Sequence, residues 1–471
     1  ANPSPVVVAA AAAVVVRKRG ARTALHRLTG MRAAVWVVVW NLLGRVWRRV
    51  RGRHLTQFPP HPIAPRILDV EEAVLATDWE GSPAPLELRT ASSRAEVRRT
   101  IEEGHALLRR TVASDAPCLT PFGRFAHARQ WRDMVAIREG FARQMEEKGA
   151  AVVVRGDLGA RPVVVAGLHR TGTTLLLNLL AQDPAARSPE MWEMMVPPAR
   201  ILAEGKAACV RAERASLAKA ESVVPGYLRE VHKFHHFDYD LPEEDCLLLR
   251  HIFPNPCDLW GFYGGGEVTR WFCEHADTLG TYQYRYLHAW LRWLRAEVPH
   301  PGEEHWVLKN PNHSFHLAAL RREFPDADVV VTHRDPARAV ASWAAMMLRV
   351  HITGLSDDCA PLDLAQYGRA ILGHFVAASE ALVRGCQQDD RIHHISFATL
   401  VADPIACIQS LYGRLGRPFT PAYRQRLERY LHQHARHKHG KAAYSLEDVG
   451  LSPALVQDQM QTYLSYFGSY L

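Results

Sequence analysis

The sequence predicts an α/β fold with a central, mostly parallel sheet, preceded by a helical lobe. Four short runs rich in β-branched and apolar residues, each followed by a helical pattern, carry this prediction: residues 163–166, 305–309, 328–332 and 391–396. Strands that alternate with helices along a chain usually pair in parallel, because each crossover returns the chain to the same edge of the sheet. The helical lobe is predicted from helical spacing and mixed charge before the first run.

Length and composition fit one large globular domain with extensions. The chain has 471 residues, of which 48% are hydrophobic and 23% charged. We expect a basic, apolar N-terminal segment over residues 1–56, a helical lobe over 57–150 and the main domain over 151–471. The net charge of +8 favours anionic partners, although much of it lies in the N-terminal segment. The eight cysteines include no Cys-x-x-Cys pair, so their spacing predicts no zinc site.

The N-terminal segment contains two apolar runs, at residues 6–16 and 33–44. Both are shorter than the roughly 20 residues that cross a membrane as a helix. Trp36, Trp40 and Trp47 lie among arginines, which is typical of a segment at a membrane surface. A helix packed on the core or on a partner subunit is the alternative. We expect a cytoplasmic protein with peripheral membrane contact as one option, and a Golgi-type lumenal location stays open.

The first strand run leads into a loop that suits an anion. Residues 163–180 read Val-Val-Val-Ala-Gly-Leu-His-Arg-Thr-Gly-Thr-Thr-Leu-Leu-Leu-Asn-Leu-Leu, a pattern of strand, polar loop and buried helix. Gly167 and Gly172 have the spacing of a P-loop, but Thr173 replaces the lysine of that motif and the cation comes earlier, at Arg170. Loop amides and the helix dipole attract a phosphate-like anion. The missing lysine makes the loop poorly suited to a triphosphate.

Two further strand runs also end in polar residues. Lys309 ends one run and His313 follows four residues later. Arg334 follows the next run, directly before an Asp-Pro pair that is suited to begin a helix carrying Ser342. Because the carboxyl ends of parallel strands meet at one edge of a sheet, we expect these side chains to lie at the ligand-binding edge.

These motifs together resemble those of the sulfotransferases that use 3′-phosphoadenosine 5′-phosphosulfate (PAPS). Arg-Thr-Gly-Thr-Thr at residues 170–174 resembles the 5′-phosphosulfate loop of that family, and Arg334 with Ser342 resembles its 3′-phosphate element. Lys309 and His313 resemble its Lys-x-His element, with the histidine displaced by two positions. The resemblance implies a three-layer, P-loop-like fold, PAPS as a co-substrate rather than a bound cofactor, and no metal.

The resemblance also implies site residues. The predicted donor-binding residues are Gly167, Arg170, Thr171, Gly172, Thr173, Thr174, Arg334 and Ser342, with Lys438 and Lys441 in a basic closing loop. Lys309 and Arg170 would stabilise charge during transfer to an acceptor hydroxyl or amine. A base must take the acceptor proton, and Glu193 and His313 compete for that role. We favour Glu193, because a Trp-Glu pair supplies the candidate base in several branches of the family.

The sequence constrains the identity of the acceptor less than that of the donor. The aromatic residues between Trp260 and Trp271 favour an apolar or amphipathic alcohol, such as a lipid or a sterol, but aromatic rings also stack on sugars. Histidines and carboxylates at residues 231–245 invite a metal-site interpretation, yet they repeat no known ligand spacing. A Pro-Glu-Glu-Asp element at 242–245 is expected to shape the acceptor pocket.

Two other functions stay open at this point. One is a nucleotide-dependent phosphotransferase or NTPase on a similar fold, disfavoured by Thr173 at the lysine position. The other is a non-catalytic, membrane-binding protein that acts through its basic N-terminal segment. No basic stripe interleaved with aromatic residues occurs in the predicted core, so we expect no nucleic-acid partner. The oligomeric state is open.

Overall fold

The structure is a computed structural model that describes residues 90–113, 121–147, 158–223, 227–252, 265–300, 304–351, 364–434 and 443–471. The predicted N-terminal segment over residues 1–56 lies outside these ranges. So do the aromatic residues 260–263, and Lys438 and Lys441 of the predicted closing loop.

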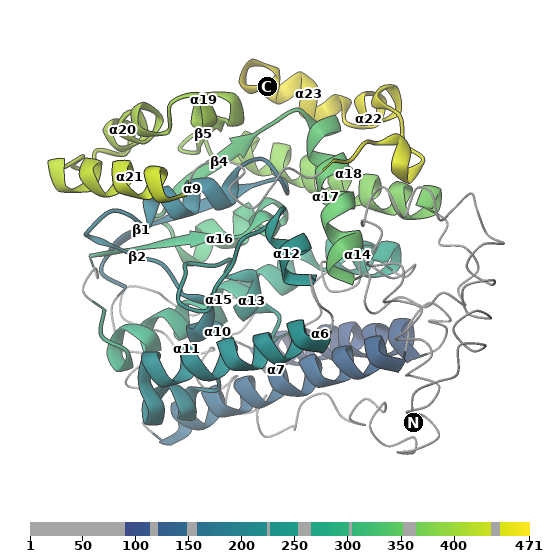
Figure 1. Cartoon of the computed structure of the whole chain (residues 1–471). Helices are drawn as coiled ribbons and strands as arrows, with labels where there is room; N and C mark the ends of the chain where they lie inside the picture. The colour runs from purple at the N-terminus through teal and green to yellow at the C-terminus, as the bar shows by residue number, and fades with distance from the viewer. Residues whose placement is uncertain are drawn as a thin grey trace, which may run out of the picture.

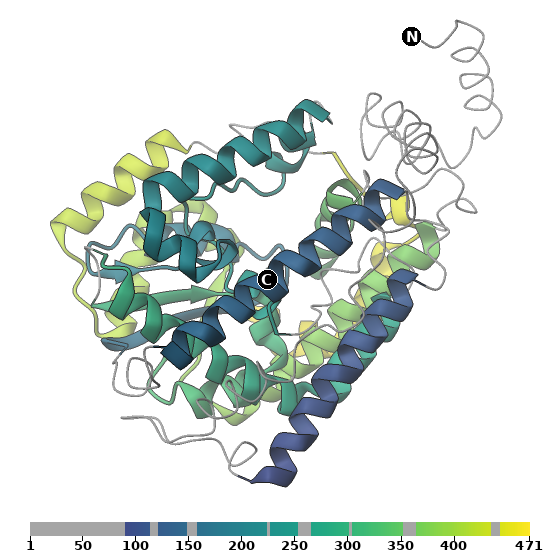
Figure 2. The same ribbon diagram turned by 90° about the horizontal axis from the view of Figure 1, so that it is seen from below.

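Two long helices precede the sheet and lie along one side of the α/β core (Figures 1 and 2). They are α6 (Ala91–Ala113) and α7 (Pro121–Glu147), and we propose that they represent the helical lobe expected over residues 57–150. The second of these helices, α7, begins at Pro121. Proline is favoured at a first helical position, where its missing N–H leaves no intrahelical bond unmade.

Within the described ranges, the sheet has five parallel strands in the order β2-β3-β1-β4-β5. In the register of the central strand, Val165 pairs with Lys309 on one side and with Val330 on the other. This confirms the predicted α/β fold and brings the ends of three strands to one edge. The strands are β1 (Ala160–Gly167), β2 (Ala186–Arg187), β3 (His305–Lys309), β4 (Asp328–His333) and β5 (His393–Ser396).

Helices cover both faces of the sheet. Val163 and Val165 of β1 belong to one buried cluster, whereas Val164 and Ala166 belong to another. Successive strand residues point to opposite faces, so these two clusters are the two sides of a three-layer fold (Figure 1). The helices of the first side are α9 (Thr173–Leu180), α20 (Pro404–Leu415) and α21 (Pro421–Gln433), and those of the second include α15 (Ala276–Glu297), α16 (Leu317–Glu323), α17 (Pro336–His351) and α18 (Leu364–Gln388).

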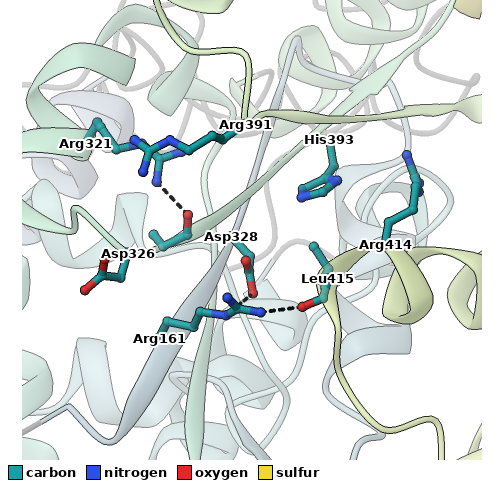
Figure 3. A pocket seen from close by; sticks show the side chains of 9 residues that line it. Arg161, Arg321, Asp326, Asp328, Arg391, His393, Arg414 and Leu415 are labelled. Atoms are coloured by element: carbon teal, nitrogen blue, oxygen red, sulfur yellow. Dashed lines mark hydrogen bonds and ion pairs between the residues drawn. The ribbon is translucent and has the colours of Figure 1, made fainter.

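At the amino ends of the strands, ion pairs surround a hollow of about 550 Å³ (Figure 3). Asp328, the first residue of β4, pairs with Arg161 at 3.1 Å and with Arg417 at 2.8 Å. Asp389 pairs with Arg321 at 2.6 Å. These carboxylates hold the arginines in place and tie β1 and β4 to the segments beside them. None of the predicted site residues within the described ranges lines the hollow, and the predicted site residues that end or follow β1, β3 and β4 lie at the carboxyl ends of those strands.

Candidate active site

The backbone conformation of the loop between β1 and α9 requires glycine at two positions. Gly167 has φ of 129° and Gly172 has φ of 99°. A Cβ atom would lie 2.7 Å from the Thr332 carbonyl oxygen at Gly167, and 2.7 Å from the Phe397 ring at Gly172. Both positions therefore need glycine. Arg170, with φ of 66°, is the one non-glycine residue with positive φ in the described part of the chain, and such strain clusters at functional sites.

The amino end of α9 faces this loop. Gly172 is the N-cap of the helix, and no side chain within the described ranges caps it. The first N–H groups of a helix have no intrahelical partner, so those at Thr173 and Thr174 are left for a ligand or water. Together with the helix dipole they favour an anion. The structure thus has the strand, loop and helix that the sequence predicted, and anion binding by this loop stays a prediction.

The Thr171 side chain makes its hydrogen bonds within the protein. Its Oγ1 donates to the Leu168 carbonyl oxygen at 2.7 Å and lies 2.7 Å from Thr332 Oγ1. Thr171 is fully buried. Its hydroxyl therefore fixes the loop against β4, and only its backbone amide remains as a donor for a ligand.

Arg170, Arg334 and Ser342 meet beside the loop. Arg170 Nε donates to Ser342 Oγ at 3.1 Å, and Arg334 Nη1 donates to the Arg170 carbonyl oxygen at 2.9 Å. The Arg334 guanidinium stacks on the Phe397 ring at 4.4 Å from its centroid. Burial lowers the pKa of Arg170 and of Arg334, but arginine stays charged in proteins. The two predicted phosphate elements thus form one cationic patch.

Tyr444 also belongs to this patch, although no motif in the sequence pointed to it. Arg334 donates a hydrogen bond to Tyr444, and the Tyr444 hydroxyl also acts electrostatically on Arg170. The Tyr444 ring lies 5.9 Å from the Phe234 ring. Tyr444 follows residues 435–442, which contain the predicted closing loop. The C-terminal part of the chain therefore reaches the anion loop.

Lys309, at the end of β3, links the sheet to the anion loop. Its Nζ donates to Thr174 Oγ1 at 3.0 Å and forms an ion pair with the Glu244 carboxylate. The Lys309 side chain is 0% exposed, whereas that of Glu244 is 20% exposed. The carboxylate is thus the accessible member of the pair.

A histidine and two glutamates lie together beside Lys309. His235 Nε2 is 2.7 Å from Glu243 Oε2, and Glu243 Oε1 accepts the Glu244 N–H at 2.8 Å. Burial acts to lower the pKa of His235, but the two carboxylates outweigh it and the pKa is raised. Burial acts to raise the pKa of Glu243, but His235 and Lys309 outweigh it and the pKa is lowered. One ligand atom from each of His235, Glu243 and Glu244 lies within 4.8 Å of the others, a spacing that a divalent cation also uses.

Glu193 is held by internal bonds on α10 (Met191–Met195). Its Oε1 accepts from Arg187 Nη2 at 2.9 Å, and its Oε2 accepts from the Glu190 N–H at 2.9 Å as half of a capping box. Burial raises the pKa of Glu193, against the opposing effect of Arg187. The role of base stays a prediction for Glu193, and it would require breaking these bonds.

His313 is also engaged through both ring nitrogens. Nδ1 lies 2.9 Å from the Tyr284 hydroxyl and Nε2 lies 3.1 Å from Asp245 Oδ2. His313 is fully buried on η3 (Pro311–Phe315). The Asp245 N–H donates to the Lys309 carbonyl oxygen at 3.1 Å. The role of base stays a prediction for His313, whose ring contacts Asp245, the residue next to Glu244.

Trp271, the described member of the predicted acceptor aromatics, is a core residue. Its ring packs so closely on Gly104 of α6 that a Cβ there would lie 2.3 Å away. It is 8% exposed and belongs to the large buried cluster. Because Trp271 packs in the core, it does not support the predicted aromatic acceptor site. No helix in the described ranges is long and apolar enough to cross a membrane.

Known proteins resemble this chain in sequence and in fold. The profile of the sulfotransferase family matches residues 162–421. The ω-hydroxy-β-dihydromenaquinone-9 sulfotransferases Stf3 of Mycobacterium bovis and Mycobacterium tuberculosis are 26% identical over 295 residues, which is 59% of this chain and 68% of theirs.

Two solved structures share the fold. Sulfotransferase STF9 from Mycobacterium avium superposes with a TM-score of 0.62 at 22% identity, covering 87% of this chain and 97% of that one. Sulfotransferase STF1 from Mycobacterium tuberculosis H37Rv superposes with a TM-score of 0.56 at 23% identity, covering 77% and 91%.

Proposed function

Because this chain belongs to the sulfotransferase family, we propose that its anion loop and Arg334 bind PAPS, from which a sulfuryl group passes to an acceptor hydroxyl. The contact of Arg334 with the Arg170 carbonyl oxygen at 2.9 Å carries this proposal. It joins two cationic elements in one patch, which suits a ligand with two separate phosphate groups. An amine acceptor is the less supported variant.

The proposed roles follow from the positions of the side chains. The uncapped amides of Thr173 and Thr174, together with Arg170, would hold the 5′-phosphosulfate and stabilise charge that develops on it. Arg334 and Ser342 would bind the 3′-phosphate, for which a guanidinium is well shaped. Lys309 would neutralise the transferring group. Lys438 and Lys441 are proposed to close over the nucleotide from the loop before Tyr444.

Calorimetric binding of 3′,5′-adenosine bisphosphate, the desulfated product, tests this proposal. We expect the bisphosphate to bind more tightly than ATP or 5′-AMP. Arg334→Ala should weaken binding at least tenfold, because a charge-assisted hydrogen bond contributes about 1.5–3 kcal/mol. Arg338→Ala is the matched control: it removes the same charge from the first turn of α17, four residues after Arg334, where the side chain is 76% exposed, and binding should stay within twofold.

Two results would count against the proposal. Equal binding of ATP and the bisphosphate would return the chain to the phosphotransferase alternative. No binding of either nucleotide by the wild-type protein would leave the anion loop without a nucleotide ligand and would favour a different donor.

We further propose a lipid alcohol as the acceptor. The name of the Stf3 relatives specifies a hydroxylated menaquinone, which is an isoprenoid lipid with a terminal hydroxyl group. The test compares release of the bisphosphate from PAPS with farnesol in a mild detergent and with lactose. A higher rate with farnesol would support a lipid acceptor. A higher rate with lactose would contradict it and favour a carbohydrate acceptor.

A further inference from the structure

The proposed reaction needs a group that takes the acceptor proton. That group must lie within hydrogen-bond reach of the acceptor oxygen, next to the transferring sulfuryl group. The side-chain oxygens of Glu193 and the ring nitrogens of His313 are all hydrogen-bonded to other residues of the protein. Glu244 differs from both of them, because its charged partner is Lys309, the cation at the end of β3.

A continuous polar path runs from the anion loop to Glu244. Thr174 Oγ1 accepts from Lys309 Nζ at 3.0 Å, and the same ammonium is paired with Glu244 Oε1. Glu244 also acts electrostatically on Arg170 of the loop. The Glu244 carboxylate therefore faces the cations that would surround the sulfuryl group.

The backbone on both sides of Glu244 is fixed. Its own N–H donates to Glu243 Oε1 at 2.8 Å, and the next residue, Asp245, donates its N–H to the Lys309 carbonyl oxygen at 3.1 Å. Asp245 is in turn held by His313 at 3.1 Å. A base must be positioned to within a fraction of an ångström to be efficient. The neighbours of Glu244 supply that positioning, and its half-buried side chain stays accessible.

We propose that Glu244 is the catalytic base of this chain and that Lys309 holds it until the donor binds. This inference rests on the proposed use of PAPS. The sulfonate oxygens of the donor would compete for Lys309 and release the carboxylate. The acceptor oxygen then forms a bond to sulfur, the acceptor proton moves to the Glu244 carboxylate, and the bond between sulfur and the bridging oxygen breaks with its electrons going to the phosphate.

His235 is the alternative base within the same group. Its Nε2 is 2.7 Å from Glu243 Oε2, an arrangement in which a carboxylate orients an imidazole. The groups that act on His235 are Glu243, Glu244 and Lys309. Its described bond is to Glu243, whereas Glu244 contacts Lys309 directly, and this contact favours Glu244. A cation held by the three side chains is the other alternative.

The decisive variant is Glu244→Gln, which keeps the shape of the side chain and removes its basicity. We expect release of the bisphosphate from PAPS, with farnesol or water as acceptor, to fall at least 100-fold. Binding of 3′,5′-adenosine bisphosphate should at the same time tighten at least threefold, because Lys309 loses its internal partner and the site loses one negative charge. Tighter binding with slower turnover would show that the donor site is intact, so that the lost rate is not a loss of donor binding. Glu244→Asp should restore part of the rate.

Glu243→Gln is the matched control, since it removes the same charge one residue earlier and leaves the pair of Lys309 and Glu244 in place. It should lower turnover less than Glu244→Gln, without a gain in affinity. Thermal melting of every variant reports whether the fold is kept.

Three outcomes would overturn the inference while leaving PAPS as the donor. One is turnover of Glu244→Gln within threefold of wild type. Another is a large loss in His235→Gln with none in Glu244→Gln. The third is loss of wild-type turnover in EDTA that ZnCl₂ restores, since Glu244 would then be a metal ligand. If wild type fails to bind the bisphosphate, the proposed donor fails instead.

Discussion

Glu193→Gln distinguishes a structural glutamate from a catalytic one. The side chains of Glu193 and Arg187 are 3% and 1% exposed, and their ion pair measures 2.9 Å. The variant removes the carboxylate charge that pairs with the buried Arg187, and breaking a buried ion pair typically costs about 3–5 kcal/mol of unfolding free energy. A chain of 471 residues unfolds with an entropy of roughly 1 kcal/mol/K, so the Tm should fall by about 3–5 °C.

Scanning calorimetry and turnover at 20 °C together give the answer. We expect the rate of PAPS turnover per folded molecule to stay within about threefold of wild type, because the described partners of Glu193 are Arg187 and the Glu190 amide. A general base would instead cost about 10²–10⁴-fold. Glu204→Gln is the control: its ion pair with Arg200 at 2.9 Å lies at the surface, and the Tm should not change measurably.

One result would refute this reasoning. An unchanged Tm with turnover reduced more than 100-fold would show that Glu193 acts in the reaction and that its buried pair contributes little to stability. The double variant Arg187→Met with Glu193→Leu adds a second check. It should melt above Glu193→Gln, because removing both charges leaves no unpaired ion in the core.

Three other changes have expected outcomes. Gly172→Ala should weaken binding of the bisphosphate at least tenfold, since a Cβ would lie 2.7 Å from the Phe397 ring; calorimetry with normal affinity would contradict the loop geometry. His313→Ala should lower the free energy of unfolding by roughly 2–4 kcal/mol in urea, because the fully buried Asp245 loses a partner at 3.1 Å; an unchanged midpoint is the opposing result. Asp328→Asn should lower it by about 1–3 kcal/mol, since the carboxylate pairs with two arginines at the amino ends of the strands; bisphosphate binding should stay the same, because the anion loop lies at the other edge.

The sequence predicted features that depend on neighbouring residues. The loop from Gly167 to Thr174 and the strand end at Lys309 were predicted from local patterns, and the structure has both. The predicted Asp-Pro helix start is also present, since Asp335 Oδ1 accepts the Ala337 N–H at 2.8 Å. Each of these features is decided by a few consecutive residues, so pattern and capping rules suffice.

Contacts between distant residues could not be predicted in this way. Thr171 and Thr332 are 161 positions apart, and Lys309 and Glu244 are 65 apart. Such pairs depend on how whole elements pack. No local pattern indicates which side chain forms a hydrogen bond with the Thr171 hydroxyl. β2 was missed for a simpler reason: two residues are too few to show a strand period. The Pro-Glu-Glu-Asp element was the one signal that pointed to Glu244.

The position of β1 at the centre of the sheet has a consequence for synthesis of the protein. Ala160 pairs with His305, and Val163 pairs with Asp328. At typical translation rates, the ribosome needs roughly ten to thirty seconds to pass from the first of these strands to the next. During that time an apolar strand has left the ribosome without either of its neighbours, and unpaired strands of this kind associate with other chains. We therefore expect the yield of soluble protein to depend on chaperones that cover the nascent chain until β3 and β4 have been made.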